Sequence, residues 1–469
     1  MLCACYVYIH IVNDIPEWAL KFRGRGVQIR NFGNRYYAYR TRTKWDKEKK
    51  KTISLSPEYI GVVTRGGIVK RNSISGTRGD YEYGNVALLY AMAERTLLPV
   101  LTQVFPYTYE GIIVYVILRE IEPLPMKSVR YLLEKTWLSR AFKESITPRS
   151  ISLMLSSLSE ENMIGVMRSL TDKGEYVLMD STAIFSRSVN IPILELEHNA
   201  HSIHVPQINL MMLFSSSRKE PTFLRIIPGS IRDVSAMKAT LDMAGVERCV
   251  IITDKGFFSA RNAKELRKEH LSFIVPLRRN SSLIPETAEF SGVFDYDGRP
   301  VKFWMPVDGV FTFEDQILRM EEEKDYLERV RRREMSRKRF IENSVNFGKI
   351  HILSDLKENP EKIYRLYKQR EYVEYAFNIF KNDLEADRPY LRDDHMLFSY
   401  LFLNMLALNL HFQILNRIDG RYGVRDALLI LSRIKIYTLD GAEIMGEIPK
   451  RANVLVKQLD VDLSMLRKN

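Results

Sequence analysis

The 469-residue sequence is poor in cysteine, with only Cys3, Cys5 and Cys249. Cys3 and Cys5 are separated by one residue, whereas the cysteines of zinc sites are usually separated by two or more. This number is also too small for the disulfide framework that stabilises small secreted domains. We therefore expect free thiols in a reducing cytoplasm and no structural zinc site.

The sequence also lacks a clear targeting segment. The start, MLCACYVYIHIVNDIPEWAL, is briefly apolar, but no basic residue precedes the apolar run, which breaks at Asn13-Asp14. A signal peptide is therefore not expected.

One apolar stretch, 396–415, is long enough to be mistaken for a membrane helix. It contains several polar side chains that would be costly in lipid, namely Ser399, Asn404, Asn409, His411 and Gln413. We therefore expect a helix buried in a large core and no membrane partner. His411 is expected to be a hydrogen-bonded core residue rather than a ligand.

Acidic residues are fewer than basic ones: 58 Asp and Glu against 70 Lys and Arg, for a net charge of +12. Such a balance suits a polyanionic partner, without choosing among DNA, RNA and anionic lipid. The hydrophobic content of 45% and the charged content of 27% are typical of a soluble globular protein. At roughly 100–200 residues per domain, the chain has room for two or three domains.

The segment YRLYKQREYVEYAFNIFKNDL (364–384) carries the most informative pattern. Tyr367, Arg370, Glu374 and Lys381 would fall within an arc of roughly 60° on one helix. An apolar stripe lies beside them, made of Leu366, Val373, Phe377, Phe380 and Leu384. A carboxylate flanked by two cations and a phenol suits a metal site that also holds phosphate. The alternative is an ordinary amphipathic helix with charge pairs at i,i+4.

Two aspartates further upstream each follow a short apolar run of the kind that forms buried strands. Asp180 closes the run 176–179, and Asp254 closes the run 249–253. Ligand-binding groups of α/β sheets lie where such strands end, although a lone Asp there is more often a cap. Together with Glu374, the two aspartates supply three oxygen ligands, which suit Mg²⁺ or Mn²⁺. Two such ions can activate water or a 3′-hydroxyl and stabilise the leaving oxygen of a phosphodiester.

With these residues the chain resembles the DDE transposases of prokaryotic insertion sequences, in the group with the Y-x2-R-x3-E-x6-K signature. Tyr367, Arg370, Glu374 and Lys381 match that signature without a gap, and MDSTAIFS and IITDKGFFS resemble the two aspartate motifs around Asp180 and Asp254. IIPGSIRDVSAM, YYAYRTRTKWDKEKKK and DYEYGNVALLYAMAER also resemble segments of the family.

The resemblance implies a DNA transposase that cuts transposon ends and transfers the strand to a target, as in cut-and-paste transposition. It implies that Asp180, Asp254 and Glu374 hold two Mg²⁺ (or Mn²⁺) ions, and that Tyr367, Arg370 and Lys381 bind DNA. The implied partners are the terminal inverted repeats and target DNA, bound by a homodimer or higher assembly. The implied location is the cytoplasm of a prokaryote, on the nucleoid. Two alternatives stay open: an RNase H-like structure-specific nuclease, and an inactive or domesticated DNA-binding protein of the same fold.

The basic residues are concentrated in 20–71, where aromatics are interleaved with them. Alternation in 36–42 and a Gly66-Gly67 turn predict a small β unit. Cations with aromatics suit nucleic acid, and the alternative is a solvated hairpin. The next region, to about 170, has a helical pattern, in which 126–158 could form a helix-turn-helix or part of a plain bundle.

The expected fold is α/β, with an RNase H-like core, a β-rich insertion between the second Asp and the Glu, and an N-terminal β/helical DNA-binding region. The insertion follows from turn signals at 296–298 and 308–309, and also from the resemblance. Residues 314–340 are expected to form one charged helix whose late cations make a solvated face or, alternatively, a contact with the DNA backbone. Asp355, after one more strand, is expected to cap the strand end rather than to be a fourth ligand.

We expect six regions: 1–75, basic and β-rich; 76–170, helical; 171–280, first part of the core; 281–345, insertion and charged helix; 346–430, second part of the core; and 431–469, C-terminal tail.

Overall fold

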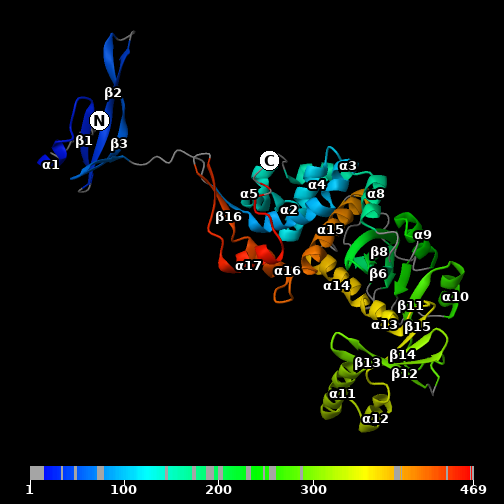
Figure 1. The fold of residues 1–469 in the computed structure, drawn as a ribbon. Coiled ribbons are helices and arrows are strands. Elements are labelled where there is room, and N and C mark those ends of the chain that lie inside the picture. Colours follow the sequence, from blue (N-terminus) through cyan, green and yellow to red (C-terminus); the bar gives the residue numbers. More distant parts are fainter. Residues whose placement is uncertain are drawn as a thin grey trace, which may run out of the picture. The chain divides into compact units, whose positions relative to one another are not determined.

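The structure is a computed structural model (Figure 1). It describes residues 15–32, 35–46, 50–70, 79–142, 146–171, 176–185, 195–198, 204–228, 234–246, 249–252, 260–285, 289–384, 391, 393–439, 442–464 and 466. The chain forms two compact units: Met1–Arg78 with Thr438–Ala442, and Gly79–Tyr437 with Glu443–Asn469.

The N-terminal unit is a four-stranded antiparallel sheet of order β1-β2-β3-β4. Its elements are α1 (Glu17–Leu20), β1 (Val27–Phe32), β2 (Arg35–Asp46), β3 (Lys51–Thr64) and β4 (Gly67–Lys70). Its buried core is small and consists of Ala19, Ile29, Ala38 and Val63. The turn expected at Gly66-Gly67 joins β3 to β4, and Gly67 has a φ of 139°. The small β unit expected from the alternation is therefore present.

Within the described residues, seven helices between residues 84 and 170 of the larger unit pack into its main core. They are α2 (Gly84–Thr96), α3 (Leu98–Val104), α4 (Tyr109–Ile121), α5 (Val129–Lys135), α6 (Leu138–Ala141), α7 (Pro148–Ser157) and α8 (Glu160–Leu170). α7 starts as its sequence predicts, because Pro148 occupies the first turn and Thr147 forms a capping box with Ser150.

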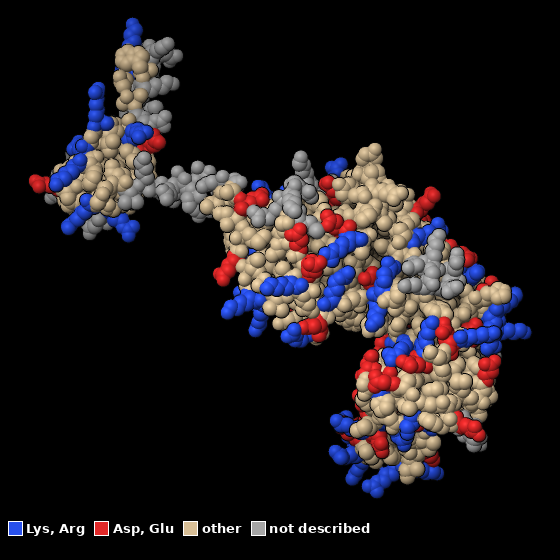
Figure 2. Space-filling view, viewed as in Figure 1, with Lys and Arg blue, Asp and Glu red and all other residues tan. Residues whose placement is uncertain are grey.

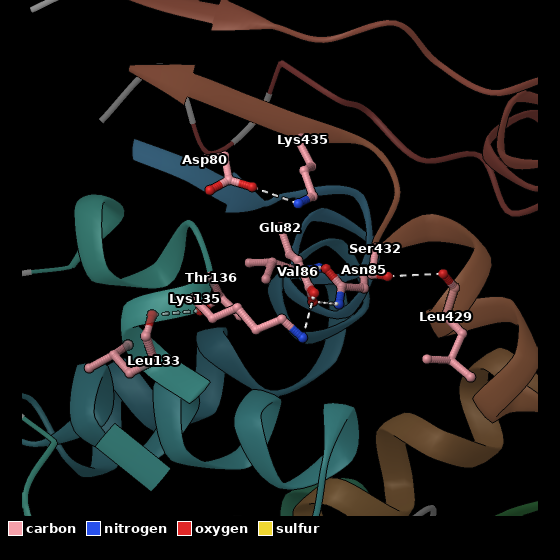
Figure 3. A network of polar contacts seen from close by, with 10 residues as sticks. All are labelled: Asp80, Glu82, Asn85, Val86, Leu133, Lys135, Thr136, Leu429, Ser432 and Lys435. Atoms are coloured by element: carbon pink, nitrogen blue, oxygen red, sulfur yellow. Dashed lines mark hydrogen bonds and ion pairs between the residues drawn. The ribbon is translucent and has the colours of Figure 1, made fainter. Parts of the chain in front are cut away.

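A three-stranded sheet of order β17-β16-β5 is formed by β5 (Gly79–Glu82), β16 (Lys435–Leu439) and β17 (Ala442–Met445). Side chains of β5 tie it to its neighbours, as Figure 3 shows. Lys435 Nζ lies 2.7 Å from Asp80 Oδ2, and Lys135 Nζ lies 2.7 Å from Glu82 Oε1. Helices α16 (Val424–Leu431) and α17 (Lys450–Gln458) flank β16 in the sequence.

The main sheet has ten strands within the described residues, in the order β12-β13-β14-β15-β11-β10-β6-β8-β7, with β9 paired to β8. Its first half contains β6 (Val177–Phe185), β7 (Glu195–His198), β8 (His204–Ser215), β9 (Glu220–Pro228), β10 (Cys249–Ile252) and β11 (Ser272–Pro276). β10 is parallel to both β6 and β11, whereas β8 is antiparallel to β6 and β9. Between the strands lie α9 (Val234–Ala244) and α10 (Ala260–Lys268).

The inserted β strands extend this same sheet. They are β12 (Phe290–Tyr296), β13 (Arg299–Val307) and β14 (Val310–Asp315), and β14 pairs with β15 (Lys349–Ser354). Both predicted turns are present, because Asp297 and Gly298 (φ 50° and 77°) and Gly309 (φ 77°) adopt the left-handed backbone that tight hairpins need.

The expectation of one charged helix over 314–340 is wrong. The structure has two helices, α11 (Gln316–Arg331) and α12 (Arg337–Ser344), which are joined by a turn in which Arg333 has a φ of 61°. Asp315 caps the first helix, and Ser336 caps the second by accepting the Arg339 N–H. Neither helix has a buried residue within the described part of the chain. The Tyr326 ring of α11 and the Phe340 ring of α12 both pack on the buried Phe347, a contact that two helices joined by a turn can make.

The apolar stretch near 396–415 forms α15 (Asp394–Leu415), which has the length and composition of a membrane helix, with 94% of its apolar window buried inside the molecule. It contacts the helices α4 and α7 on one side and strand β9 on the other (Figure 1). It therefore connects the helical part of the core to the main sheet. His411 Nδ1 lies 2.8 Å from Glu120 Oε1 with both side chains buried. The expectations of a buried helix and a hydrogen-bonded core histidine are therefore confirmed.

Candidate functional site

The segment 360–384 consists of three consecutive helical pieces rather than one regular α-helix. They are α13 (Pro360–Lys368), α14 (Arg370–Asn378) and the π-helical turn η1 (Ile379–Asp383). At the first junction the Tyr372 N–H donates to the Gln369 carbonyl three residues back, which tightens the turn. At the second, the Leu384 N–H donates to the Ile379 carbonyl five residues back, which widens it. The expected arc of 60° assumed a constant α-helical rotation, so it does not hold from Tyr367 to Lys381.

The apolar stripe of this segment is confirmed. Leu366, Val373, Phe377, Phe380 and Leu384 are all buried. The Tyr372 ring, next to Val373, stacks on Phe214 of β8 with the ring centroids 6.4 Å apart. The stripe and this stack fix α14 against the main sheet, so the polar side chains of α14 are held on a rigid element.

Arg370 and Glu374 form an ion pair within α14. Arg370 Nη2 lies 2.6 Å from Glu374 Oε1, and the Glu374 side chain is 51% exposed. Within the described residues the buried Nε of Arg370 has no hydrogen-bond partner. The carboxylate is thus open to solvent, and the guanidinium keeps one buried donor free for a further acceptor. An i,i+4 pair alone would also fit an ordinary amphipathic helix.

Tyr367, one turn before Arg370, is partly buried against the core. Burial raises the pKa of its phenol, the nearby Arg370 lowers it, and the Glu374 charge raises it, with an upward shift as the result. The phenol therefore stays protonated at neutral pH and can donate a hydrogen bond to an oxyanion.

Asp180 lies within β6 and does not end it, contrary to expectation. β6 continues to Phe185 because residues 181–185 stay paired with the antiparallel β8. The parallel pairing with β10, however, stops at Met179 opposite Ile251, so Asp180 follows directly on the last parallel pair. Its Oδ1 accepts the Ser181 N–H at 2.8 Å, and the side chain is half-buried.

Asp254 lies outside the described residues. The last residue of the preceding strand β10 (Cys249–Ile252) within the described residues is Ile252. Since Ile251 pairs with Met179 in the parallel register, Ile252 lies next to Asp180. Among the part of the chain that is described, no group of three His, Cys, Asp or Glu side chains could hold a metal ion. The convergence of Asp180, Asp254 and Glu374 therefore stays a prediction.

Lys381 reaches the strand that carries Asp180. Its Nζ donates to Thr182 Oγ1 at 2.6 Å. Since side chains two apart on a strand share a face, Lys381 meets β6 on the face of Asp180. Thr182 is a site residue that the sequence patterns do not indicate, except by its position two residues after Asp180.

Asp355 caps a strand end, as expected. Its Oδ1 accepts the Phe273 N–H of β11 at 2.9 Å. Burial raises the pKa of this carboxyl group. The carboxylate is thus used by the backbone of the sheet.

Of the comparisons with known proteins, only the family model identifies this chain. No curated protein matches the sequence significantly. Among solved structures, a cryo-EM structure of the piggyBac transposase synaptic complex with hairpin DNA is similar at 13% identity and a TM-score of 0.37, over 84% of this chain and 84% of that chain. This likeness is too low to support an inference about this chain.

The family model of the transposase DDE domain matches residues 171–410, which is more than half of the 469 residues. The matched range contains the mixed α/β sheet, the inserted strands and all six candidate site residues. Members of this family bind DNA and use divalent metal ions to break and join phosphodiester bonds. The chain therefore belongs to the DDE transposases and is a DNA transposase.

Proposed function

We propose that this transposase works by cut-and-paste transposition, in which Asp180, Asp254 and Glu374 bind two Mg²⁺ or Mn²⁺ ions at the scissile bond. The observation that carries the proposal is the contact between Lys381 Nζ and Thr182 Oγ1 at 2.6 Å, since it joins the helical segment of Glu374 to the strand of Asp180. Two elements that lie about 200 residues apart in sequence thereby meet on one face of the sheet.

The donor atoms suit a hard cation. Asp180 and Glu374 offer carboxylate oxygens, which are the ligands that Mg²⁺ and Mn²⁺ prefer. The one thiol in the described residues, Cys249, is buried, and burial raises its pKa, so it would stay protonated and bind no metal. When bound, two such ions activate the attacking oxygen and stabilise the leaving oxygen.

The chain's own cations would hold the DNA strand. Arg370, whose side chain is 23% exposed, would hold a phosphate oxygen beside its ion pair with Glu374. Lys381 would bind the next phosphate along the strand, and the neutral Tyr367 phenol would position it. We assign the chain to the Y-x2-R-x3-E-x6-K group of prokaryotic insertion sequences, because the spacing of these residues in the sequence matches its signature.

The proposal includes an RNase H-like fold for the core. Its strands run in the order β9-β8-β6-β10-β11, the first three antiparallel and the last two parallel to β6. In α/β sheets of this kind ligand groups gather near the ends of the parallel strands, and this is where Asp180 lies and Asp254 follows in sequence.

The N-terminal unit would supply much of the affinity for DNA. Figure 2 shows its Lys and Arg side chains spread over the visible face. Its exposed cations are Lys21, Arg23, Arg25, Arg30, Arg35, Arg40, Lys50, Lys51 and Arg65, and among the side chains described in this unit none forms an ion pair. Unpaired exposed cations are free to replace the counterions of a phosphate backbone.

The turn between α11 and α12 also carries exposed cations that form no ion pair within the described residues. We define the basic turn as Arg331, Arg332, Arg333, Arg337, Lys338 and Arg339, which are all exposed and, within the described residues, form no ion pair. Figure 2 shows blue side chains gathered over α11 and α12. We propose that the basic turn contacts DNA phosphates. The DNA partners would be terminal inverted repeats and target DNA, bound by a homodimer in a prokaryotic cytoplasm.

The test is an assay with DNA that carries the inverted repeats flanking the reading frame. Wild-type protein should cut this DNA and join its 3′ end to a target plasmid when Mg²⁺ is present. Asp180→Ala should bind the same DNA almost as well but cut it at least about a thousandfold more slowly, because cations supply the affinity and carboxylates the chemistry.

Each competing function predicts a different product. An RNase H-like nuclease would yield cut DNA without joined product, and an inactive DNA-binding protein would yield neither. Normal cleavage by Asp180→Ala would remove this residue from the site.

A further inference from the structure

A buried arginine lies behind the π-turn. Arg119 of α4 is 4% exposed, and within the described residues it forms no ion pair with a carboxylate. Its guanidinium donates instead to four neutral oxygens: the Leu124 carbonyl at 3.2 Å, Asn404 Oδ1 at 3.2 Å, the Tyr400 hydroxyl at 3.2 Å, and the Leu384 carbonyl. A buried cation without a counter-charge is costly, so its partners must offset that cost.

The partner that explains the position of this charge is the end of η1. Leu384 directly follows η1, and its carbonyl belongs to the last turn, where unsatisfied carbonyls carry a partial negative charge. A second arginine binds the neighbouring carbonyl, because Arg425 Nη2 of α16 donates to the Asp383 oxygen at 3.0 Å. Two guanidinium groups from different helices therefore hold consecutive carbonyls at the end of the π-turn.

The π-turn is also the piece that carries Lys381. Arg119 donates a hydrogen bond to the carbonyl of Leu384, at the end of the turn. Lys381 lies three residues earlier and donates to Thr182, which is two residues after Asp180. π-helical turns are rare and occur mostly as single turns within α-helices, frequently at functional sites. Loss of the Arg119 contacts would therefore let the turn relax and move Lys381.

We propose that Arg119 is a positioning residue, which holds the end of η1 and thereby keeps Lys381 against Thr182 on the face of Asp180. It touches no reacting atom in this arrangement and acts through Lys381. Its planar fork reaches acceptors on α15, on the chain after α4 and at Leu384 at once, which an ammonium group on the same helix could not reproduce. The proposal rests on the proposed function, because Lys381 matters for cleavage only if it binds the DNA strand.

The main experiment is a double-mutant cycle on the full chain. Arg119→Met should slow single-turnover cleavage of end DNA about tenfold in the wild-type background. It should cause almost no further loss in a Lys381→Ala background, because residues that act as a unit are not additive. Its effect on thermal stability should be the same in both backgrounds. Equal factors in both backgrounds would show a merely structural role and overturn the proposal.

Tyr367→Phe provides the matched control for the cycle. It removes a hydroxyl from the same helical segment but not from the π-turn. In the Tyr367→Phe background, Arg119→Met should therefore slow cleavage by the same factor as in the wild type. If Arg119→Met does not fold, Tyr400→Phe takes its place, since it removes one of the four acceptors of Arg119 and leaves an apolar ring of the same shape.

A second measurement does not depend on cleavage. Lysine acetylation by acetic anhydride, followed by mass spectrometry, reports how accessible each Nζ is. Arg119→Met should raise the rate at Lys381 severalfold and leave the rate at the exposed Lys457 unchanged. An unchanged rate at Lys381 would overturn the positioning role. If the wild-type protein cuts no DNA, the proposed function fails, and this measurement alone still decides whether Arg119 positions Lys381.

Discussion

The N-terminal unit carries its cations on the exposed surface of a sheet with a small core. In the segment from α13 to η1, by contrast, Arg370 and Lys381 are bound to other side chains. Arg23, Arg25 and Arg35, for example, are exposed and form no ion pair with a described carboxylate. Lys381, by contrast, binds Thr182, and Arg370 binds Glu374. Free cations can follow a flexible polyanion, but fixed cations can only meet a phosphate at one place. Under the proposed function, the first region would bind DNA and the second would align it.

The largest effect should come from the fixed cations. Lys381→Ala should reduce cleavage about a hundredfold, as removal of a single positioned donor does elsewhere. The melting temperature should change little, because a cation at the surface edge contributes little to stability. Lys381→Arg should be only partly tolerated, since a planar fork does not replace a compact ammonium at a close phosphate.

The matched control for Lys381 is Lys368→Ala, which removes a surface pair with Glu371 (2.6 Å) and should leave cleavage unchanged. Cleavage rates and melting temperatures are measured on the same preparations. Full activity of Lys381→Ala would erase the distinction between the two regions.

A smaller effect, on binding rather than on rate, should come from the N-terminal unit. Simultaneous change of Arg23, Arg25 and Arg35 to Gln should weaken DNA binding about tenfold at moderate salt. The slope of log affinity against log salt should become shallower by about 0.9 for each phosphate contact that is lost. Cleavage at saturating DNA should be retained, because the chemistry lies in the other unit.

Lys450, Arg451 and Lys457 of α17 provide the control with the same change in charge. They are exposed and, within the described residues, form no ion pair. Changing them to Gln should leave the salt slope close to that of the wild type. Equal losses in both variants would mean that net charge alone attracts the DNA.

The smallest effect should come from the basic turn, which tests whether free cations act alike in both units. Changing Arg331, Arg332 and Arg337 to Gln should weaken binding severalfold and lower the salt slope by less than the N-terminal variant does, since fewer cations surround the turn. An affinity and a slope equal to those of the wild type, measured beside the α17 control, would return the basic turn to a solvated surface.

Local rules predicted much of the fold from the sequence. The hairpin turns at 297–298 and 309 lie where the turn residues of the sequence place them. The capping of α7 by Thr147 and the buried stripe of 364–384 also follow from residue type and spacing. These features depend on neighbours within a few residues, which one sequence contains.

Features that depend on distant contacts could not be predicted. Asp180 was expected to end its strand, but pairing with β8 carries β6 on to Phe185. The π-turn depends on Arg119 and Arg425, which lie far from it in sequence. The break between α11 and α12 goes with a contact across the helix pair, because the rings of Tyr326 in α11 and Phe340 in α12 both pack on the buried Phe347.

The candidate site shows the same limit. The spacing of Tyr367, Arg370, Glu374 and Lys381 predicted a transposase. The match of residues 171–410 to the transposase DDE domain confirms this family. The sequence does not indicate Thr182 or Arg119. A hydroxyl residue near the Asp180 motif and an arginine in an apolar helix are both common, and neither has a distinctive spacing. Asp254 lies outside the described residues, so its role rests on the sequence.

The continuity of the inserted strands with the core sheet has a consequence for how the molecule unfolds. β14 shares one ladder with β15, and β15 shares another with β11, so the hydrogen bonds run from the insertion into the centre of the sheet without interruption. The Tyr364 ring of α13 packs among Phe294, Tyr296 and Phe313 of the inserted strands. Segments linked in this way open as one cooperative unit. The amides of β14 should therefore exchange their hydrogens with solvent as slowly as those of β11, and the insertion should melt together with the core.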